Sequence, residues 1–472
     1  MKLAALALAA LLSVSGAAGM PAAANPVIPA EVTTALADNL DYRPLANIAN
    51  QTWQNNLETR ISLRNNATAV TGAATNGVRV SGNTISITAP GIYRISGTLA
   101  NGQLVVNSNR AGLVRLILDN ANVTSRNGSA LAITNAETVA LVIASGSTNS
   151  LVDAQTYAVT GSGAPNSTLD STADLVISGT GRLNITGNAN RGINARAGLV
   201  INGPRLQVTA ADDAIRGQNY VVIVGGNLNL TAADDGIVSN ADLAADGAPT
   251  QGYVAILNGN ITISAADDAI TAETEVIVAN GQLDITRSYE GIEGSNILIA
   301  GGVIDIKSED DGINAAHDVL RRLGITISGG TITIDAEGDG LDANGVLQQT
   351  GGSVVIHGST SNRQSSMDAN RPIMLDGGTL FALGSAGMID NPSADSAQDW
   401  LIFVLDRTVP AGSQLEIRDP NGRRVAALTS EKGATAVTYS APRLPRSGTY
   451  TLTANRQVVG SATLNQPVQR RR

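Results

Sequence analysis

The sequence of 472 residues contains no cysteine, and only 3% of its residues are aromatic. The lack of cysteine excludes disulfide bonds, thiolate metal sites and a lipid-modified N-terminal cysteine. The only lysines are Lys2, Lys307 and Lys432, the net charge is −9, and no basic stripe with interleaved aromatics occurs. We therefore expect no nucleic-acid partner. With His317 and His357 as the only histidines, zinc and copper sites are not favoured either.

Long apolar runs are also missing, except at the N-terminus. Leu3 to Val14 is apolar and follows Lys2, and Ala22 to Ala24 supplies small residues suited to cleavage. We predict that residues 1–24 are a signal peptide and that the protein is exported to the periplasm or out of the cell. No later apolar run is long enough to cross a membrane. The sequence leaves the oligomeric state open.

The sequence contains fifty glycines and a short phrase that is repeated along the chain. The phrase is two acidic residues, a tiny residue and an aliphatic one. It occurs, with some drift, as Asp212-Asp213-Ala214-Ile215, Asp234-Asp235-Gly236-Ile237, Asp267-Asp268-Ala269-Ile270, Tyr289-Glu290-Gly291-Ile292, Asp310-Asp311-Gly312-Ile313 and Gly338-Asp339-Gly340-Leu341. Arg191-Gly192-Ile193 fills the same slot one step earlier. The most frequent step is 22 residues, about one coil of a parallel β-solenoid.

The fold prediction is an all-β, right-handed parallel β-helix with about 22 residues per coil. Aliphatic residues alternate with polar ones, so the aliphatic set should point inward. The polar set should form one outward column of Asn184, Gln207, Asn229, Thr262, Asp284, Asp305 and Thr333. The longer steps predict loops near residues 240–252 and 315–323, the second with His317 and Arg321-Arg322.

Four segments follow from the changes in composition. Residues 1–24 are the signal peptide, 25–57 an N-terminal cap or linker with a short helix near Glu31 to Asn39, and 58–390 the β-helix. A cap would cover the unpaired strand edges of the first coil. Residues 391–472 read as antiparallel strands with a hairpin turn at Asp419-Pro420-Asn421-Gly422, which predicts a small C-terminal β-module.

Stacking the repeated phrase would place carboxylates one above another. Equivalent residues in adjacent coils lie about 4.8 Å apart, where two carboxylates repel by about 3 kcal/mol at an effective dielectric of 20. Calcium prefers oxygen ligands and fits between such carboxylates, so we predict bound Ca²⁺. The candidate ligands are Asp212, Asp213, Asp234, Asp235, Asp267, Asp268, Glu290, Glu293, Asp310, Asp311, Asp339, Asp342 and Asn344.

Two alternatives stay open for these residues. Aspartate before glycine is common in turns, where its side chain accepts hydrogen bonds from nearby backbone amides. Which acid of each pair would face the ion is also undecided. The outward column has the same ambiguity, because Asp284 and Asp305, with Lys307 beside them, could form a polar platform for polysaccharide or a plain solvated face.

The chain also resembles bacterial carbohydrate-binding β-helix proteins related to calcium-dependent pectate lyases. The phrases that carry the resemblance are Gly91 to Leu99, Arg115 to Asn122, Tyr289 to Gly294, Asp310 to Ala315 and Gly338 to Gly345. The resemblance covers about residues 58–387 and implies several calcium ions on the acidic column and affinity for plant-type or acidic polysaccharides. Arg191 departs from it, because an acid would extend the column there.

Three functions remain. We favour a non-catalytic, calcium-dependent protein that binds acidic, uronate-type polysaccharide, because calcium can bridge an acidic protein to a polyanion. A pectate-lyase-like enzyme is the alternative, and Lys307 is its candidate base, since β-elimination needs a base beside the metal. Lys307 reads equally as a partner of surface acids. A structural or adhesive surface solenoid without a sugar ligand is the third possibility.

Overall fold

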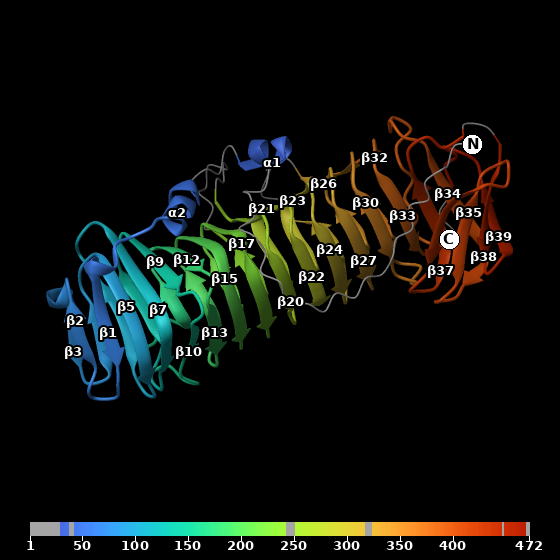
Figure 1. The fold of residues 1–472 in the computed structure, drawn as a ribbon. Helices are drawn as coiled ribbons and strands as arrows, with labels where there is room; N and C mark the ends of the chain where they lie inside the picture. The colour runs from blue at the N-terminus through green and yellow to red at the C-terminus, as the bar shows by residue number, and fades with distance from the viewer. Residues whose placement is uncertain (1–28, 37–41, 242–250, 317–322, 446–447, 469–472) are drawn as a thin grey trace, which may run out of the picture.

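The computed structural model describes residues 29–36, 42–241, 251–316, 323–445 and 448–468. They form a long solenoid of parallel coils followed by a smaller antiparallel module (Figure 1). The solenoid has about 12 turns, which confirms the predicted all-β parallel β-helix. The proposed signal peptide, most of the first predicted loop, and His317 and Arg321-Arg322 of the second lie outside the described residues.

Each coil has three faces, and the strands of a face pair in parallel along the axis. The first face consists of the ends of β5 (Gly91–Leu99), β7 (Leu113–Thr124), β15 (Gly198–Ala210) and β17 (Tyr220–Ala232) with β10 (Thr148–Val152), β13 (Arg182–Gly187), β20 (Asn260–Ser264), β22 (Gln282–Arg287), β24 (Val303–Ser308), β27 (Thr331–Ala336), β30 (Ser353–His357) and β33 (Thr379–Gly384).

The second face consists of β4 (Thr84–Ile87), β6 (Gln103–Asn107), β8 (Leu131–Asn135), β11 (Ser167–Ser171), β14 (Arg191–Ala195), β16 (Ile215–Gly217), β18 (Ile237–Ser239), the starts of β21 (Ile270–Val278) and β23 (Ile292–Ile299), β25 (Ile313–Ala315), β28 (Leu341–Ala343) and β31 (Met367–Ala369). The third face consists of β1 (Glu58–Leu63), the starts of β5 and β7, β9 (Thr138–Ile143), β12 (Asp174–Gly179), the starts of β15 and β17, β19 (Tyr253–Ile256), the ends of β21 and β23, β26 (Gly324–Ile327), β29 (Val346–Gln349) and β32 (Ile373–Leu375).

Aliphatic ladders hold the coils together. Leu183 pairs with Leu206 and Leu206 with Leu228, and all three side chains are buried in one continuous core. No single coil could bury such a core alone, so adjacent coils supply the contacts. The predicted outward column is confirmed as well, because its members occupy equivalent register positions from Asn184 through Asp284 to Thr333.

Antiparallel strands close both ends of the solenoid. At the first coil, β2 (Ala69–Gly72) pairs with β1, and β3 (Val78–Ser81) pairs with β4. At the last coil, β37 (Ala434–Ser440) pairs with β33 on one side and with β34 (Trp400–Val409) on the other. A second sheet of the module has the order β36 (Arg424–Thr429), β35 (Gln414–Arg418), β38 (Tyr450–Ala454) and β39 (Gln457–Ala462). The hairpin predicted at Asp419 is confirmed between β35 and β36.

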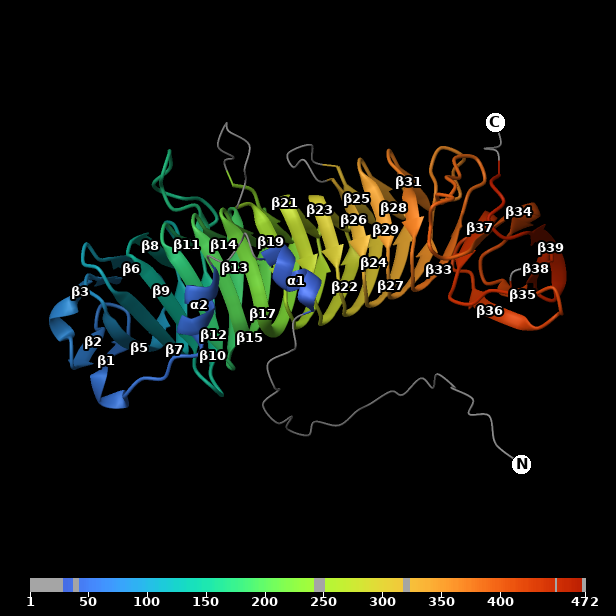
Figure 2. The same cartoon turned by 90° about the horizontal axis from the view of Figure 1, so that it is seen from above.

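The sequence suggested that the N-terminal segment caps the end of the solenoid. In the structure, this segment lies along the side of the solenoid instead. The helices α1 (Ala30–Ala35) and α2 (Tyr42–Ala49) bury Val32 and Leu45 against outward apolar residues of the third face (Figures 1 and 2). Those residues include Val176 and Val222. Among the residues that the structure describes, no helix is long and apolar enough to span a membrane.

Candidate metal centre

The acidic phrases stack at the corner where the first face passes into the second. The aliphatic residues that end the phrases are register partners, as in Ile215 with Ile237 and Ile237 with Ile270. The same alignment continues through Ile292 and Ile313. The second acid of each phrase therefore lies above the second acid of the previous phrase. We call this row, from Asp213 to Asp339, the acid column.

Backbone amides fix one oxygen of most column carboxylates. The N–H of Asp268 donates to Oδ1 of Asp235 at 3.0 Å, and the N–H of Glu290 donates to Oδ1 of Asp268 at 3.2 Å. Asp311 accepts from the N–H of Asp339 at 2.6 Å in the same way. The alternative of turn chemistry thus holds in part, although each amide belongs to the next coil and not to the same turn.

The tiny third residue of the phrase is required by close packing between coils. A Cβ atom added to Gly291 would lie 2.3 Å from the carbonyl oxygen of Gly312 and 2.5 Å from Cγ2 of Ile306. Ala214 and Ala269 occupy this slot in other coils and are fully buried. The phrase therefore turns its third residue into the core and leaves its acids at the corner.

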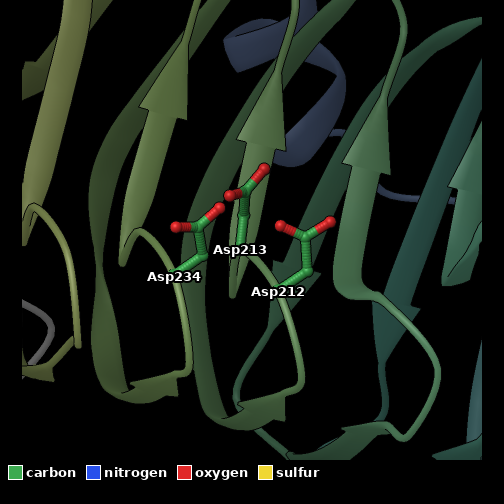
Figure 3. Close-up of side chains that lie close together, drawn as sticks. All are labelled: Asp212, Asp213 and Asp234. Atoms are coloured by element: carbon green, nitrogen blue, oxygen red, sulfur yellow. The ribbon is translucent and has the colours of Figure 1, made fainter.

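Three groups of carboxylates come close enough to share an ion. Within each group, one oxygen per residue lies within 4.8 Å of the others. The groups are Asp212, Asp213 and Asp234; Asp234, Asp235 and Asp267; and Asp268, Glu290 and Glu293. Figure 3 shows the first group at the ends of two adjacent turns. These acidic groups could hold a metal ion, and oxygen-only ligand sets suit a hard cation.

Burial and mutual repulsion make the charged form of these acids costly. Burial, with the charges of Glu290 and Glu293, raises the pKa of Asp268 to about 9. Burial also raises the pKa of Asp235 to about 7, aided by the neighbouring acids and opposed by its bond to the amide of Asp268. The pKa of Glu290 rises to about 7 for the same main reason, although the Asn314 amide opposes the rise. Without a cation, these groups retain protons near neutral pH.

Arginines already neutralise the N-terminal end of the column. Nε of Arg191 lies 2.6 Å from Oδ2 of Asp213, and its Nη2 lies 3.3 Å from Oδ2 of Asp212. Arg216 approaches Asp213 as well, at 3.6 Å. The sequence had indicated that Arg191 replaces an acid here. The first carboxylate group therefore has less need of a metal than the other two.

The C-terminal candidates are aligned but more dispersed. Burial raises the pKa of Asp311 and of Asp339 to about 7, with Asp310, Asp342 and Asp368 contributing charge. Among the described residues, no three-carboxylate group includes any of the C-terminal acids Asp310, Asp311, Asp339 and Asp342. Asn344 is engaged elsewhere, since its Nδ2 donates to the carbonyl of Ala316 and its Oδ1 accepts from Asn370.

Asp284, Asp305 and Lys307 lie on the first face, around the corner from the column. Asp284 and Asp305 are register partners, and the Lys307 side chain is exposed at the end of β24. In the described part of the chain, Lys307 forms no ion pair. Its register partner Asp335 pairs instead with Lys432 of the C-terminal module, at 2.8 Å. Lys307 thus makes no close contact with an acid there, although its charge opposes the rise that burial causes in the pKa of Asp305.

Sequence inspection missed two features near the column. The residue after the aliphatic one also forms an outward row on the second face, and this places Arg216 and Asn314 beside the acids, in line with Glu293, which the sequence had already suggested as a ligand. Register alone could have revealed this row. Asn314 donates from Nδ2 to both carboxylate oxygens of Glu290 at 3.0 Å, while its buried Oδ1 has no hydrogen-bond partner among the described residues.

Comparison with known proteins places the chain in a family. A model described as carbohydrate-binding domain-containing protein matches residues 81–326 and 286–399, more than half of the chain. The chain belongs to this family. The matched ranges include the whole acid column. The family description names a carbohydrate-binding domain.

Two similar proteins can be compared with this chain. The chain is similar to a carbohydrate-binding domain-containing protein of Acetivibrio thermocellus, with 34% identity over 136 residues, which are 28% of this chain and 48% of that protein. It thus matches about half the length of that relative. It is also similar to the solved structure of a polysaccharide lyase-like protein from C. thermocellum, a gadolinium derivative, with 31% identity and a TM-score of 0.44 over 48% of this chain and 94% of that chain.

Proposed function

We propose that this protein is a calcium-dependent, non-catalytic binding protein for acidic, uronate-type polysaccharide. The group of Asp268, Glu290 and Glu293 carries the proposal. Three carboxylates converge there within 4.8 Å, and burial with mutual repulsion raises the pKa of Asp268 to about 9. Such a cluster needs either protons or a cation, and a bound cation would allow all three acids to ionise at neutral pH.

Calcium fits the donor set better than other common ions. Every member of the groups is a carboxylate, and calcium takes six to eight oxygen ligands at about 2.3–2.6 Å. The buried, unpartnered Oδ1 of Asn314 offers a neutral oxygen beside Glu290. The second group, Asp234 with Asp235 and Asp267, provides a similar oxygen-only set. Residues of these two groups would hold the ions, whose positive charge would attract an anionic ligand.

Acidic polysaccharide is the ligand class that makes use of this arrangement. With a net charge of −9, the bare protein would repel a polyanion. Calcium on the column reverses that sign locally, so that a uronate carboxylate can complete the coordination of the ion. Aromatic platforms for flat neutral glycans are scarce, because only 3% of the residues are aromatic. A polysaccharide ligand also suggests a place outside the cytoplasm, and we propose export by the N-terminal signal segment.

The test is retention on polygalacturonate with calcium or with excess chelator. We expect calcium-dependent retention of the wild type and no release of unsaturated, ultraviolet-absorbing products. Asp268→Asn and Glu293→Gln should weaken retention, whereas Glu309→Gln should not, because Glu309 is an exposed acid that pairs with Arg287 on the surface. Growing product absorbance would indicate a lyase. Calcium binding without retention of any polysaccharide would instead favour a structural solenoid.

A further inference from the structure

A groove adjoins the N-terminal end of the acid column on the second face. It has a volume of about 650 Å³, within the range typical of ligand pockets. One wall is the connection between β10 and β11, which rises from the coils beside the second face (Figure 2). That connection occupies the corner that holds the acid phrases in later coils. The floor comes from β14, β16 and the residues flanking them.

The connection is fixed at both of its ends. Tyr157 donates its hydroxyl to Oδ2 of Asp153 at 2.7 Å, and Asp153 also accepts from the N–H of Asn188 at 2.6 Å. At the other end, Nη2 of Arg196 donates to the carbonyl of Ala164 at 2.5 Å. The wall of the groove is therefore bound to the neighbouring coil, and the groove exists before any ligand arrives.

The groove differs in charge from the rest of this acidic chain. Its lining contains Arg191, Arg196 and Arg216 and no acidic residue. Of the acids that pair with these arginines, Asp170 and Asp213 lie behind them, with side chains only 2% and 3% exposed, whereas Asp212, which pairs with Arg191, is 20% exposed. The arginine side chains are 19–26% exposed. At Arg196 and Arg216, a ligand in the groove thus meets a guanidinium group before it meets a carboxylate.

Of the three arginines in the groove, Arg216 has the most N–H donors left for a ligand. Its only ion pair in the described residues is the 3.6 Å approach of Nη1 to Asp213, and no hydrogen bond to its guanidinium is formed there. A guanidinium carries five N–H donors in a planar fork that matches a carboxylate. Arg191 is held by two acids but keeps Nη1 without a hydrogen-bond partner among the described residues. Arg196 is a positioning residue, because it fixes the wall.

We infer that this groove binds a uronate carboxylate of the polysaccharide directly, through Arg216 with support from Arg191 and without a metal ion. The inference rests on the proposed function and adds a second, calcium-independent contact to it. Arg191 occupies the column position one coil before Asp213, so the groove and the calcium-binding groups follow each other along one line of the surface. A single polyuronate chain lying along the solenoid would contact the arginines at one end and the ions at the other.

The test measures the affinity of short oligogalacturonates by calorimetry, in calcium and in chelator. Arg216→Gln should weaken binding at least about tenfold, equivalent to about 1.4 kcal/mol, under both conditions. Arg205→Gln is the matched control, since Arg205 is an exposed arginine on the first face of the same coil. Arg216→Lys keeps the charge but loses the fork, so its affinity should fall between those of the wild type and Arg216→Gln. Unchanged melting temperatures would show that each variant folds.

The outcomes separate the two proposals. If the wild type binds no oligogalacturonate in either condition, the proposed function fails. If the wild type binds and Arg216→Gln binds equally well, only the groove inference is overturned. Methyl-esterified oligogalacturonate supplies the chemical control, because it lacks the carboxylate and should be insensitive to Arg216→Gln. An equal loss for the ester would mean that the groove reads hydroxyls, which also overturns the inference.

Discussion

Chelation of calcium should destabilise this protein, and the loss should grow as the pH rises from 5 to 8. In the metal-free folded state, burial raises the pKa of Asp235 from 3.8 to about 7, so folding favours its protonated form. The folded state then binds more protons than the unfolded state between these values, and stability falls as the pH rises through them. A shift of this size corresponds to about 4 kcal/mol for one group.

The expected change in melting temperature follows from the size of the fold. An unfolding entropy of about 2.1 cal/mol/K per residue over roughly 400 residues converts 4 kcal/mol into about 5 °C. Several column acids contribute, although their coupling prevents simple addition. Circular dichroism melts in chelator at pH 5, 6, 7 and 8 should show the decline. Calcium at 100 times its dissociation constant should restore about 2.7 kcal/mol per site at pH 8.

The effect of Asp268→Asn on the melting temperature should be opposite in chelator and in calcium. The asparagine keeps an oxygen that can accept from the N–H of Glu290, and unlike Asp268, whose pKa burial raises to about 9, it does not have to take up a proton on folding at pH 8. In chelator at pH 8 the variant should melt above the wild type, and in calcium it should melt below it. Glu309→Gln should change neither value by more than about 0.5 kcal/mol, as expected for an exposed pair. A chelated wild type whose melting is flat from pH 5 to 8 would refute the reasoning.

Three further predictions concern other contacts. Arg94→Met should cost about 3–5 kcal/mol in denaturant unfolding, because it leaves the fully buried carboxylate of Glu58 without its partner at 2.7 Å. The Arg94 hydrogen bond lowers the pKa of Glu58, so this contribution is present at neutral pH and is lost as the pH falls below about 4. Lys432→Met should lower stability by about 1–3 kcal/mol by removing the contacts to Asp335 and to the Ala336 carbonyl, with proteolysis reporting on the C-terminal module. Lys307→Ala should leave polysaccharide retention unchanged, since this exposed side chain lies around the corner from the acid column; a loss above threefold would contradict the assignment.

Most of the fold could be predicted from the sequence because of the repeat. The alignment of Asp213, Asp235 and Asp268 follows from a period of one coil, and the inward ladders follow from strand alternation. Position along the corner was therefore predictable, whereas the partner of each acid was not. The amide of the next coil that binds Asp235 depends on the exact path of the turn, which spacing does not specify.

Contacts between segments far apart in sequence were the part that spacing could not supply. The helix α2 lies on the side of the coils because the third face carries outward apolar residues such as Val176 and Val200, which need cover. The groove depends on a connection of irregular backbone, and irregular segments have no periodicity from which to read their position.

The antiparallel strands at the two ends of the solenoid determine whether another chain could extend its sheets. A parallel ladder of identical-looking coils is a template that another copy could extend without limit, as in cross-β fibres. Here β2 and β3 reverse direction at one end, and β37 does so at the other. Each acts as a terminator, because the next strand it could accept no longer matches the coil repeat. Removing the C-terminal module would expose β33 and convert a rod of fixed length into a seed for filaments.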